Sequence, residues 1–240
     1  MGGLCDRIAD GAVPEAAVDL LGLTKLTPLL KDGGGIRPVA GGECFRKLAA
    51  RALVREHKST LQDAVGEYQY GAGRPGGAET LVHAVQVVSE ARPDSAWVQL
   101  DVANAFPSVN RRVVLEAVRE HAPALLPLAD TFLRCASSFV YQDSEGRGQL
   151  LRATLGVEQG DVLGPLLFAM AFRRPVEELR TTLVATLVEE HGFTAQEAER
   201  RAKSRKTTSL SAGLEGRALA NEVQRRVHKA EWRSAASLLQ

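Results

Sequence analysis

The segment from Ala96 to Val109 limits most strongly what this chain can fold into. Apolar residues lead up to Asp101, and Asn104 and Pro107 interrupt the pattern soon afterwards, which predicts a short buried strand that ends in a loop. A carboxylate at the end of a buried strand is unfavourable unless it faces water, a cation or a metal ion. Asp101 is therefore either the cap of the following turn or a metal ligand.

A second segment, residues 156–168, has the composition of a ligand-binding loop followed by a helix. Its glycines allow the backbone around Gln159 to approach a ligand closely, and Pro165 can begin a helix over residues 166–172. This second segment favours the metal-ligand interpretation of Asp101.

Together the two segments resemble reverse transcriptases, which are RNA-directed DNA polymerases, and most closely those of non-LTR (LINE-type) retroelements. Asp101, with Ala105 and Phe106 after it, is similar to motif A of the polymerase palm. The segment around Gln159 is similar to motif B, with Val162 in place of its first proline.

A third resemblance lies upstream, in residues 29–39. This segment is similar to the part of the fingers in which a lysine and an Arg-Pro-Ile run approach the incoming triphosphate; Lys31 and Arg37 hold those positions here. Each motif alone would be weak, but three in the right order over roughly residues 26–180 form a strong signal.

The resemblance implies an α+β fold: a right-hand polymerase palm, with an antiparallel sheet and helices, plus partial fingers. The implied organisation is an unassigned N-terminal segment, a fingers-like region, a palm-like region and a divergent helical tail, at residues 1–25, 26–95, 96–180 and 181–240.

The resemblance also implies a site, with an RNA template, a DNA primer and a deoxynucleoside triphosphate as partners. Asp101, helped by the backbone carbonyl of Val102, would bind Mg²⁺ or Mn²⁺, which prefer oxygen ligands. Phe106 occupies the place of the family's aromatic steric gate, and ordinary core packing is its alternative role. The implied nucleotide-binding residues are Lys31, Arg37, Asn104, Phe106, Gln159 and Gly160.

Motif C of the family, an aromatic-x-Asp-Asp hairpin, is missing. The chain has no Asp-Asp pair and no aspartate after Asp161. The Glu189-Glu190 pair lies on a predicted helix, where adjacent residues point about 100° apart. We therefore expect weakened metal binding and no polymerisation by this chain alone, as in a truncated copy or an incomplete gene model. A non-catalytic RNA- or protein-binding remnant of the same fold is the alternative.

A rival interpretation comes from the Gly-x-Gly-x-x-Gly pattern at Gly71, Gly73 and Gly76, which a helix follows. In a dinucleotide-binding oxidoreductase such glycines hold the pyrophosphate of a nicotinamide cofactor such as NAD. That fold needs a buried strand before Gly71, whereas residues 61–70 contain several polar side chains.

A net charge of +1 argues against a uniformly basic coat, so any contact with RNA or DNA must come from local patches. The segment 44–58 predicts a helix with an apolar face that includes Phe45 and Leu48 and a basic face beside it. That basic face is either simply solvated or a surface that follows phosphates. In the tail, Lys203, Arg205 and Lys206 leave the same choice open.

Local patterns predict the remaining elements. Asn110 can cap a helix over 111–121, a second helix follows over 124–137, and residues 139–142 and 149–155 flank a hairpin turn. No signal peptide, myristoylation motif or transmembrane stretch is recognisable, so we expect a nuclear or cytoplasmic protein without a membrane partner.

Overall fold

The computed structural model describes residues 2–32, 34–91, 93, 97, 99–143, 145–191, 194 and 196. The chain divides into two compact units. The first comprises Met1–Pro75 and Val102–Arg173, and the second comprises Gly76–Asp101 and Arg174–Gln240. The three segments that resemble polymerase motifs belong to the first unit, except Asp101 and the residues before it.

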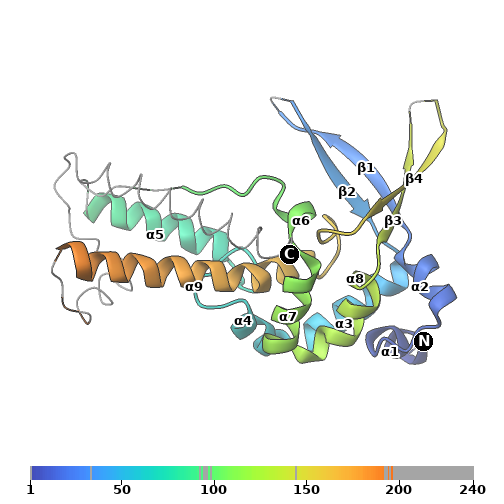
Figure 1. The fold of residues 1–240 in the computed structure, drawn as a ribbon, viewed down its shortest axis with the longest axis horizontal. Coiled ribbons are helices and arrows are strands. Elements are labelled where there is room, and N and C mark those ends of the chain that lie inside the picture. The colour runs from blue at the N-terminus through green and yellow to red at the C-terminus, as the bar shows by residue number, and fades with distance from the viewer. Residues whose placement is uncertain are drawn as a thin grey trace. The chain divides into compact units, whose positions relative to one another are not determined.

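Short helices make up most of the first unit (Figure 1). They are α1 (Gly2–Ala9), α2 (Glu15–Gly22), α3 (Cys44–Glu56), α4 (Lys58–Ala64), α6 (Ala105–Ser108), α7 (Arg111–His121), a 3₁₀ turn (Pro123–Leu125), α8 (Leu126–Leu133) and the start of α9 (Gly164–His191).

Four strands form one sheet in the order β2-β1-β3-β4. They are β1 (Thr24–Leu30), β2 (Ile36–Gly41), β3 (Ser137–Gln142) and β4 (Gly148–Ala153). The pairs β1–β2 and β3–β4 are antiparallel hairpins, and the parallel pair β1–β3 joins them through Thr24 with Phe139 and Lys25 with Val140. The α+β class agrees with the sequence, but the sheet is mixed rather than antiparallel.

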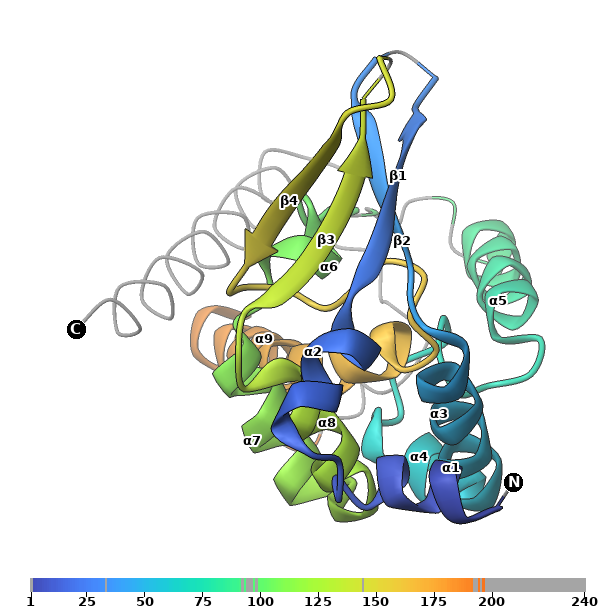
Figure 2. The same ribbon diagram turned by 90° about the vertical axis from the view of Figure 1, so that its right-hand side faces the viewer.

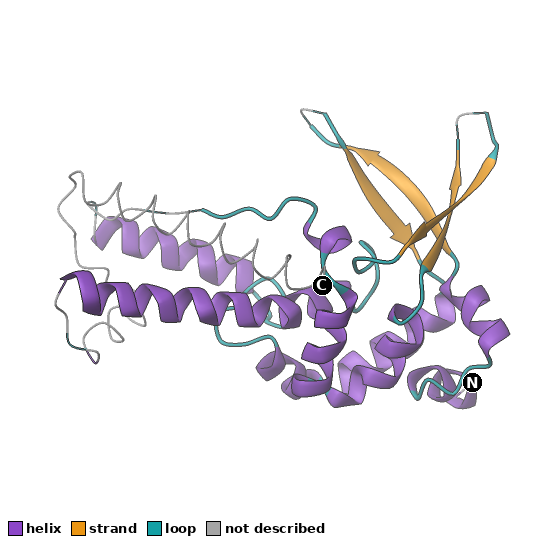
Figure 3. Ribbon diagram, viewed as in Figure 1, coloured by secondary structure: helices purple, strands orange, loops and turns teal. Residues whose placement is uncertain are grey.

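Both hairpins extend beyond the helices of their unit. They meet near the start of β1 and separate toward their turns (Figures 1 and 3). At the base of the sheet, α2 leads into β1 and β2 leads into α3 (Figure 2). Only this base is buried, so both faces of the outer hairpins are open to solvent.

One apolar core joins the helices of the first unit. Its largest fully buried apolar side chains come from α1, α7, the 3₁₀ turn and α9, and they are Ile8, Val114, Val118, Leu125 and Met170; Ala49 of α3 and Leu61 of α4 are buried in the same core. Arg173 adds polar contacts at the end of α4, where it donates to the carbonyl oxygens of Asp63 and Ala64 at 3.3 Å. The predicted fingers-like and palm-like regions therefore share a core.

The local predictions for helix α7 and the hairpin β3–β4 are confirmed. The Asn110 side chain accepts from the backbone N–H of Arg112 at 2.8 Å and so caps α7. The turn of the hairpin is held by Asp143, whose pKa lies below its usual value because backbone and side-chain N–H groups of Arg147 bind the carboxylate. The helix predicted over 124–137 is shorter, since β3 already begins at Ser137.

Helix α3 forms as predicted but presents the opposite face to the core. Arg46 is buried at 6% exposure with Ala49 and Ala50, while Phe45 and Leu48 are 43% and 45% exposed. Helix residues two positions apart point about 200° apart, so burying Arg46 turns Leu48 outward. The carboxylates that pair with Arg46 inside the unit determine which face of α3 is buried, as described below.

The strand predicted before Asp101 is absent from the described residues of that segment. Trp97, Gln99, Leu100 and Asp101 have no strand pairing, and Trp97 and Leu100 are 54% and 48% exposed. A strand is stable only when a neighbour satisfies its backbone groups. Among the described residues, all four strands belong to the sheet of the first unit, and none of them pairs with this segment.

The second unit contains α5 (Gly77–Ala91) and the later part of α9, which continues past Pro175 to His191.

Upstream of α5, the residues from α4 to Gly71 form turns and bends, so the strand that a dinucleotide fold requires is not there. Of the predicted capping box at 194–197 the structure describes only Thr194 and Gln196, and the final helix at 219–227 and the basic residues Lys203, Arg205 and Lys206 lie outside the described positions. Among described helices, none combines the length and apolar character of a membrane span.

Candidate functional site

The segments around three predicted motifs meet at the edge of strand β2. The backbone N–H of Ala40 donates to the carbonyl oxygen of Gln159 at 2.7 Å. The N–H of Val157 donates to the carbonyl oxygen of Phe106 at 2.9 Å, and the N–H of Gly156 donates to the carbonyl oxygen of Val109 at 2.8 Å. Backbone hydrogen bonds thus fix the motif B loop to both β2 and the loop around α6.

Two glycines of this loop lie where a side chain would not fit. Gly156 and Gly160 have φ values of 80° and 116°, in the region that L residues rarely adopt. A Cβ at Gly156 would lie 2.4 Å from the carbonyl oxygen of Pro107, and one at Gly160 would lie 2.6 Å from that of Ala40. The glycines therefore allow the close backbone approach that the sequence predicted, although the neighbour is protein backbone.

One face of the sheet borders a pocket of about 370 Å³. Gln159 lines it from the motif B loop, and β2 contributes Pro38 and Ala40. Its other walls are mainly apolar and come from β1, β3, β4 and the α6 loop: Leu26, Phe139, Leu151, Ala153, Leu155 and Pro107. Volumes of this order are typical of small-molecule sites, in which a few polar groups set orientation.

The side chain of Gln159 is one such polar group. It is half-buried and has no hydrogen-bond partner among the described residues. The hydrogen bond from Ala40 uses the main-chain carbonyl oxygen of Gln159 and does not involve its side chain. The side-chain amide can therefore both donate to and accept from a ligand.

The opposite face of the sheet carries all the charged residues of the four strands. Strand register places Lys25, Arg37 and Arg152 on this face, because paired residues share a face and so do residues two or four positions apart on one strand. On β1, Lys25 shares its face with Leu29, which pairs with Arg37. On β3, Val140, the partner of Lys25, shares its face with Ser138, which pairs with Arg152. The same face also has exposed or half-buried aliphatic side chains, which are Leu29, Val39, Val140 and Leu150. We call these seven residues the basic sheet face.

Acidic residues are absent from all four strands, so no carboxylate within the strands offsets the charge of the basic sheet face. Its cations are exposed. The face adjoins the motif B loop, since a Cβ at Gly160 would lie 3.5 Å from the Val39 side chain. Arg152, on the edge strand β4, also borders the pocket. Lys31 follows β1 in the exposed turn of the first hairpin.

Two further predicted nucleotide-binding residues lie at helix α6, Asn104 at its N-cap and Phe106 within it. Asn104 adopts a left-handed conformation with φ 51°, which asparagine tolerates better than most residues, and begins α6. Phe106 stacks on Phe168 with ring centroids 5.2 Å apart and is half-buried against the core. These contacts favour the core-packing role of Phe106, and its role as a steric gate stays a prediction.

Asp101 lies in the second unit, whose position relative to the first is undefined, so its predicted proximity to Gln159 stays a prediction. Its carboxylate is exposed, while Val102 is half-buried. In the described part of the chain, no three His, Cys, Asp or Glu side chains come close enough to hold a metal ion. Because a two-metal site needs several carboxylates, the described residues do not fit the pair of ions that the resemblance implies.

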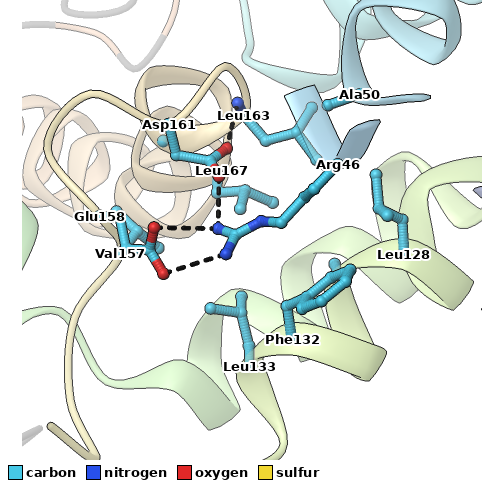
Figure 4. Close-up of a pocket in the computed structure, with 12 residues that line it drawn as sticks. Arg46, Ala50, Leu128, Phe132, Leu133, Val157, Glu158, Asp161, Leu163 and Leu167 are labelled. Atoms are coloured by element: carbon cyan, nitrogen blue, oxygen red, sulfur yellow. Dashed lines mark hydrogen bonds and ion pairs between the residues drawn. The ribbon is translucent and has the colours of Figure 1, made fainter. Parts of the chain in front are cut away.

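Sequence analysis missed a buried charge network behind the motif B loop. Arg46 of α3 contacts Glu158 through Nη1 to Oε1 at 3.2 Å and Nη2 to Oε2 at 3.1 Å, and its Nη2 also pairs with Asp161 (Figure 4). Thr24 donates to Glu158 at 3.2 Å. The guanidinium also lies over the ring of Phe132, 4.8 Å from its centroid.

Electrostatics favours the charged form of Arg46. Burial lowers the pKa of its guanidinium, but the charges of Asp161 and Glu158 outweigh that effect and raise the pKa above its usual value. Arg46 is therefore charged throughout the physiological pH range.

A second buried arginine, Arg111 at the start of α7, was also missed. It donates to the carbonyl oxygens of Gly156 at 2.9 Å and Cys135 at 2.6 Å, and to the Ser137 hydroxyl at 2.8 Å. Burial lowers the pKa of Arg111, and the charge of Glu158 partly opposes this shift. Arg111 thus joins α7, the end of β4 and the start of β3, and its donors are used for structure.

The class of protein that these segments suggest agrees with comparisons to known proteins: the chain is similar to retrotransposon proteins and has a retroelement-related origin. It is 28% identical over 165 residues to the retrotransposable element SLACS 132 kDa protein of Trypanosoma brucei gambiense, a match that covers 66% of this chain. It is 33% identical over 143 residues to the retrovirus-related Pol polyprotein from type-1 retrotransposable element R2 of Nasonia vitripennis, which covers 52% of this chain.

Each match spans 13% of the relative's length. No protein-family model matches the chain.

Proposed function

We propose that this chain is part of a reverse transcriptase, with the fingers and part of the palm in its first unit, and that its basic sheet face binds an RNA template. The observation that carries the proposal is the placement of Lys25, Arg37 and Arg152 on one exposed face of an acid-free sheet. The similarity to retrotransposon proteins supports the same assignment.

The chemistry of the basic sheet face suits a single-stranded polyanion. Cations contact phosphates without regard to sequence, and exposed aliphatic side chains between them can contact sugars and bases. Beside this face, the Gln159–Gly160 turn brings a glutamine amide, which can both donate and accept hydrogen bonds to a base or ribose. In this proposal, phosphate contacts position the strand and Gln159 contacts one nucleotide.

Removing the three cations is expected to weaken RNA binding and its dependence on salt. Each phosphate contact on a single strand contributes about 0.7 to the slope of log K against log salt, so the variant Lys25→Gln/Arg37→Gln/Arg152→Gln should lose about 2 from that slope. Fluorescence anisotropy with a labelled single-stranded RNA, titrated at several salt concentrations, measures both quantities.

The matched control replaces three exposed arginines on α7 and at the end of α8, away from the basic face of α3, as Arg112→Gln/Arg119→Gln/Arg134→Gln. It changes the net charge equally but leaves the basic sheet face intact. Equal losses of slope in the two triple variants would show that RNA responds to overall charge, and the proposed surface would then be wrong.

The chain by itself is not expected to extend a primer. One motif A aspartate without an Asp-Asp pair leaves a two-metal mechanism short of ligands, which removes several kcal/mol of transition-state stabilisation. The test is primer extension on an RNA template with Mg²⁺ or Mn²⁺, with Asp101→Ala as control. Incorporation that disappears in this control variant would contradict the expectation.

A further inference from the structure

One guanidinium holds both sides of the turn that presents Gln159. Glu158 and Asp161 come immediately before and after the pair Gln159–Gly160, and both carboxylates bind the Arg46 side chain. In Figure 4 the guanidinium reaches them from α3, and side chains of α8, among them Phe132 and Leu133, lie on its other side. The two arms of the turn therefore converge on one buried cation.

Further hydrogen bonds define where that turn lies. Ala40 on β2 donates to the carbonyl oxygen of Gln159, and Thr24 on β1 donates to Glu158. The second oxygen of the Asp161 carboxylate accepts from the N–H of Leu163 at 2.7 Å, close to the start of α9. The turn is thus connected to α3, to the sheet and to α9 at once.

Stability alone does not explain this arrangement. A buried cation with two carboxylates loses its hydration, and well-packed apolar residues of similar size often give equal or greater stability. What charged, bidentate hydrogen bonds supply is geometry, since a planar guanidinium fixes the direction and spacing of its partners.

We propose that Arg46 is a positioning residue that clamps the Gln159–Gly160 turn through Glu158 and Asp161 and so holds the Gln159 side chain at the pocket. The role assigned to Gln159 in binding a nucleotide rests on the proposed function, whereas the clamp itself concerns only this chain. Arg46 touches no ligand in this scheme and acts through the position of the turn.

Hydrogen exchange followed by mass spectrometry or NMR tests the clamp without any ligand. Arg46→Lys keeps the charge and most of the side chain, but an ammonium cannot hold two carboxylates in the fixed geometry of a guanidinium. We expect the amides of Ala40, Asp161 and Leu163, whose hydrogen bonds depend on the turn, to exchange at least about tenfold faster, as loss of one charged hydrogen bond implies.

Amides of Val114 and Val118 in α7 serve as internal references, and their exchange should be unchanged. Arg112→Lys is the matched control variant, because Arg112 makes an exposed ion pair with Glu116 far from the turn in sequence. Turn amides that exchange at the wild-type rate in Arg46→Lys, or an equal acceleration of turn and reference amides, would overturn the clamp.

A double-mutant cycle adds a readout that a general structural role would not change. In a Glu158→Gln background one partner of the clamp is already weakened, so Arg46→Lys should accelerate turn exchange less than it does in the wild-type chain. Additive accelerations would overturn the proposal. RNA affinity of the wild-type chain is measured separately: its absence would refute the proposed function, and the exchange data would still decide the clamp.

Discussion

Replacing Arg46 with methionine is expected to lower the free energy of unfolding by about 3–5 kcal/mol, because Glu158 and Asp161 would be left without their buried cation. Urea unfolding followed by circular dichroism measures the change. The expected loss is large because methionine replaces only the apolar stem of arginine and pairs with neither carboxylate.

Arg112→Met is the matched control, since Arg112 forms an ion pair with Glu116 that is mostly exposed. Its loss is expected to stay below about 0.5 kcal/mol. Combining Arg46→Met with Glu158→Leu should recover part of the stability, because one unpaired carboxylate is then removed. Equal losses for Arg46→Met and Arg112→Met would mean that the buried network contributes no more than a surface pair.

The second large effect is expected at Gly156. Alanine there must adopt a φ near 80° and place its Cβ 2.4 Å from the carbonyl oxygen of Pro107. The left-handed conformation costs about 1–2 kcal/mol, and the overlap with fixed backbone adds to it, so Gly156→Ala should lose at least about 2 kcal/mol. The same urea unfolding measurement applies.

Gly34→Ala separates the two contributions. Gly34 has a φ of 95°, but its Cβ would meet nothing within 4 Å. This variant therefore measures the conformational cost alone, and the excess loss in Gly156→Ala measures the close approach of the α6 loop to the motif B loop. If Gly34→Ala loses as much stability as Gly156→Ala, the close approach described here is wrong.

Local sequence patterns predicted elements whose signals are contained in a few neighbouring residues. Asn110 before an apolar period predicted α7 and its cap, and two short runs around a polar turn predicted β3 and β4. Backbone hydrogen bonds do join the motif B loop to β2 and to the α6 loop, whereas the predicted proximity of Asp101 to Gln159 stays a prediction.

Features that depend on distant partners could not be predicted in this way. Periodicity alone turned Phe45 and Leu48 inward, and the opposite orientation of α3 follows from Arg46 meeting carboxylates more than a hundred residues away in sequence. One signal was present: acids on both sides of Gln159–Gly160 in an otherwise apolar context require a buried cation. The strand predicted before Asp101 depends in the same way on a distant partner, and none of the described strands pairs with that segment.

The backbone and side chain of Gln159 serve separate purposes. The Ala40 hydrogen bond takes only the main-chain oxygen of Gln159, and a carbonyl oxygen is the same for every amino acid. The shape of the loop is therefore independent of the side chain at this position. If Gln159 contacts a nucleotide as proposed, a substitution at this position would change that contact and leave the backbone of the loop in place.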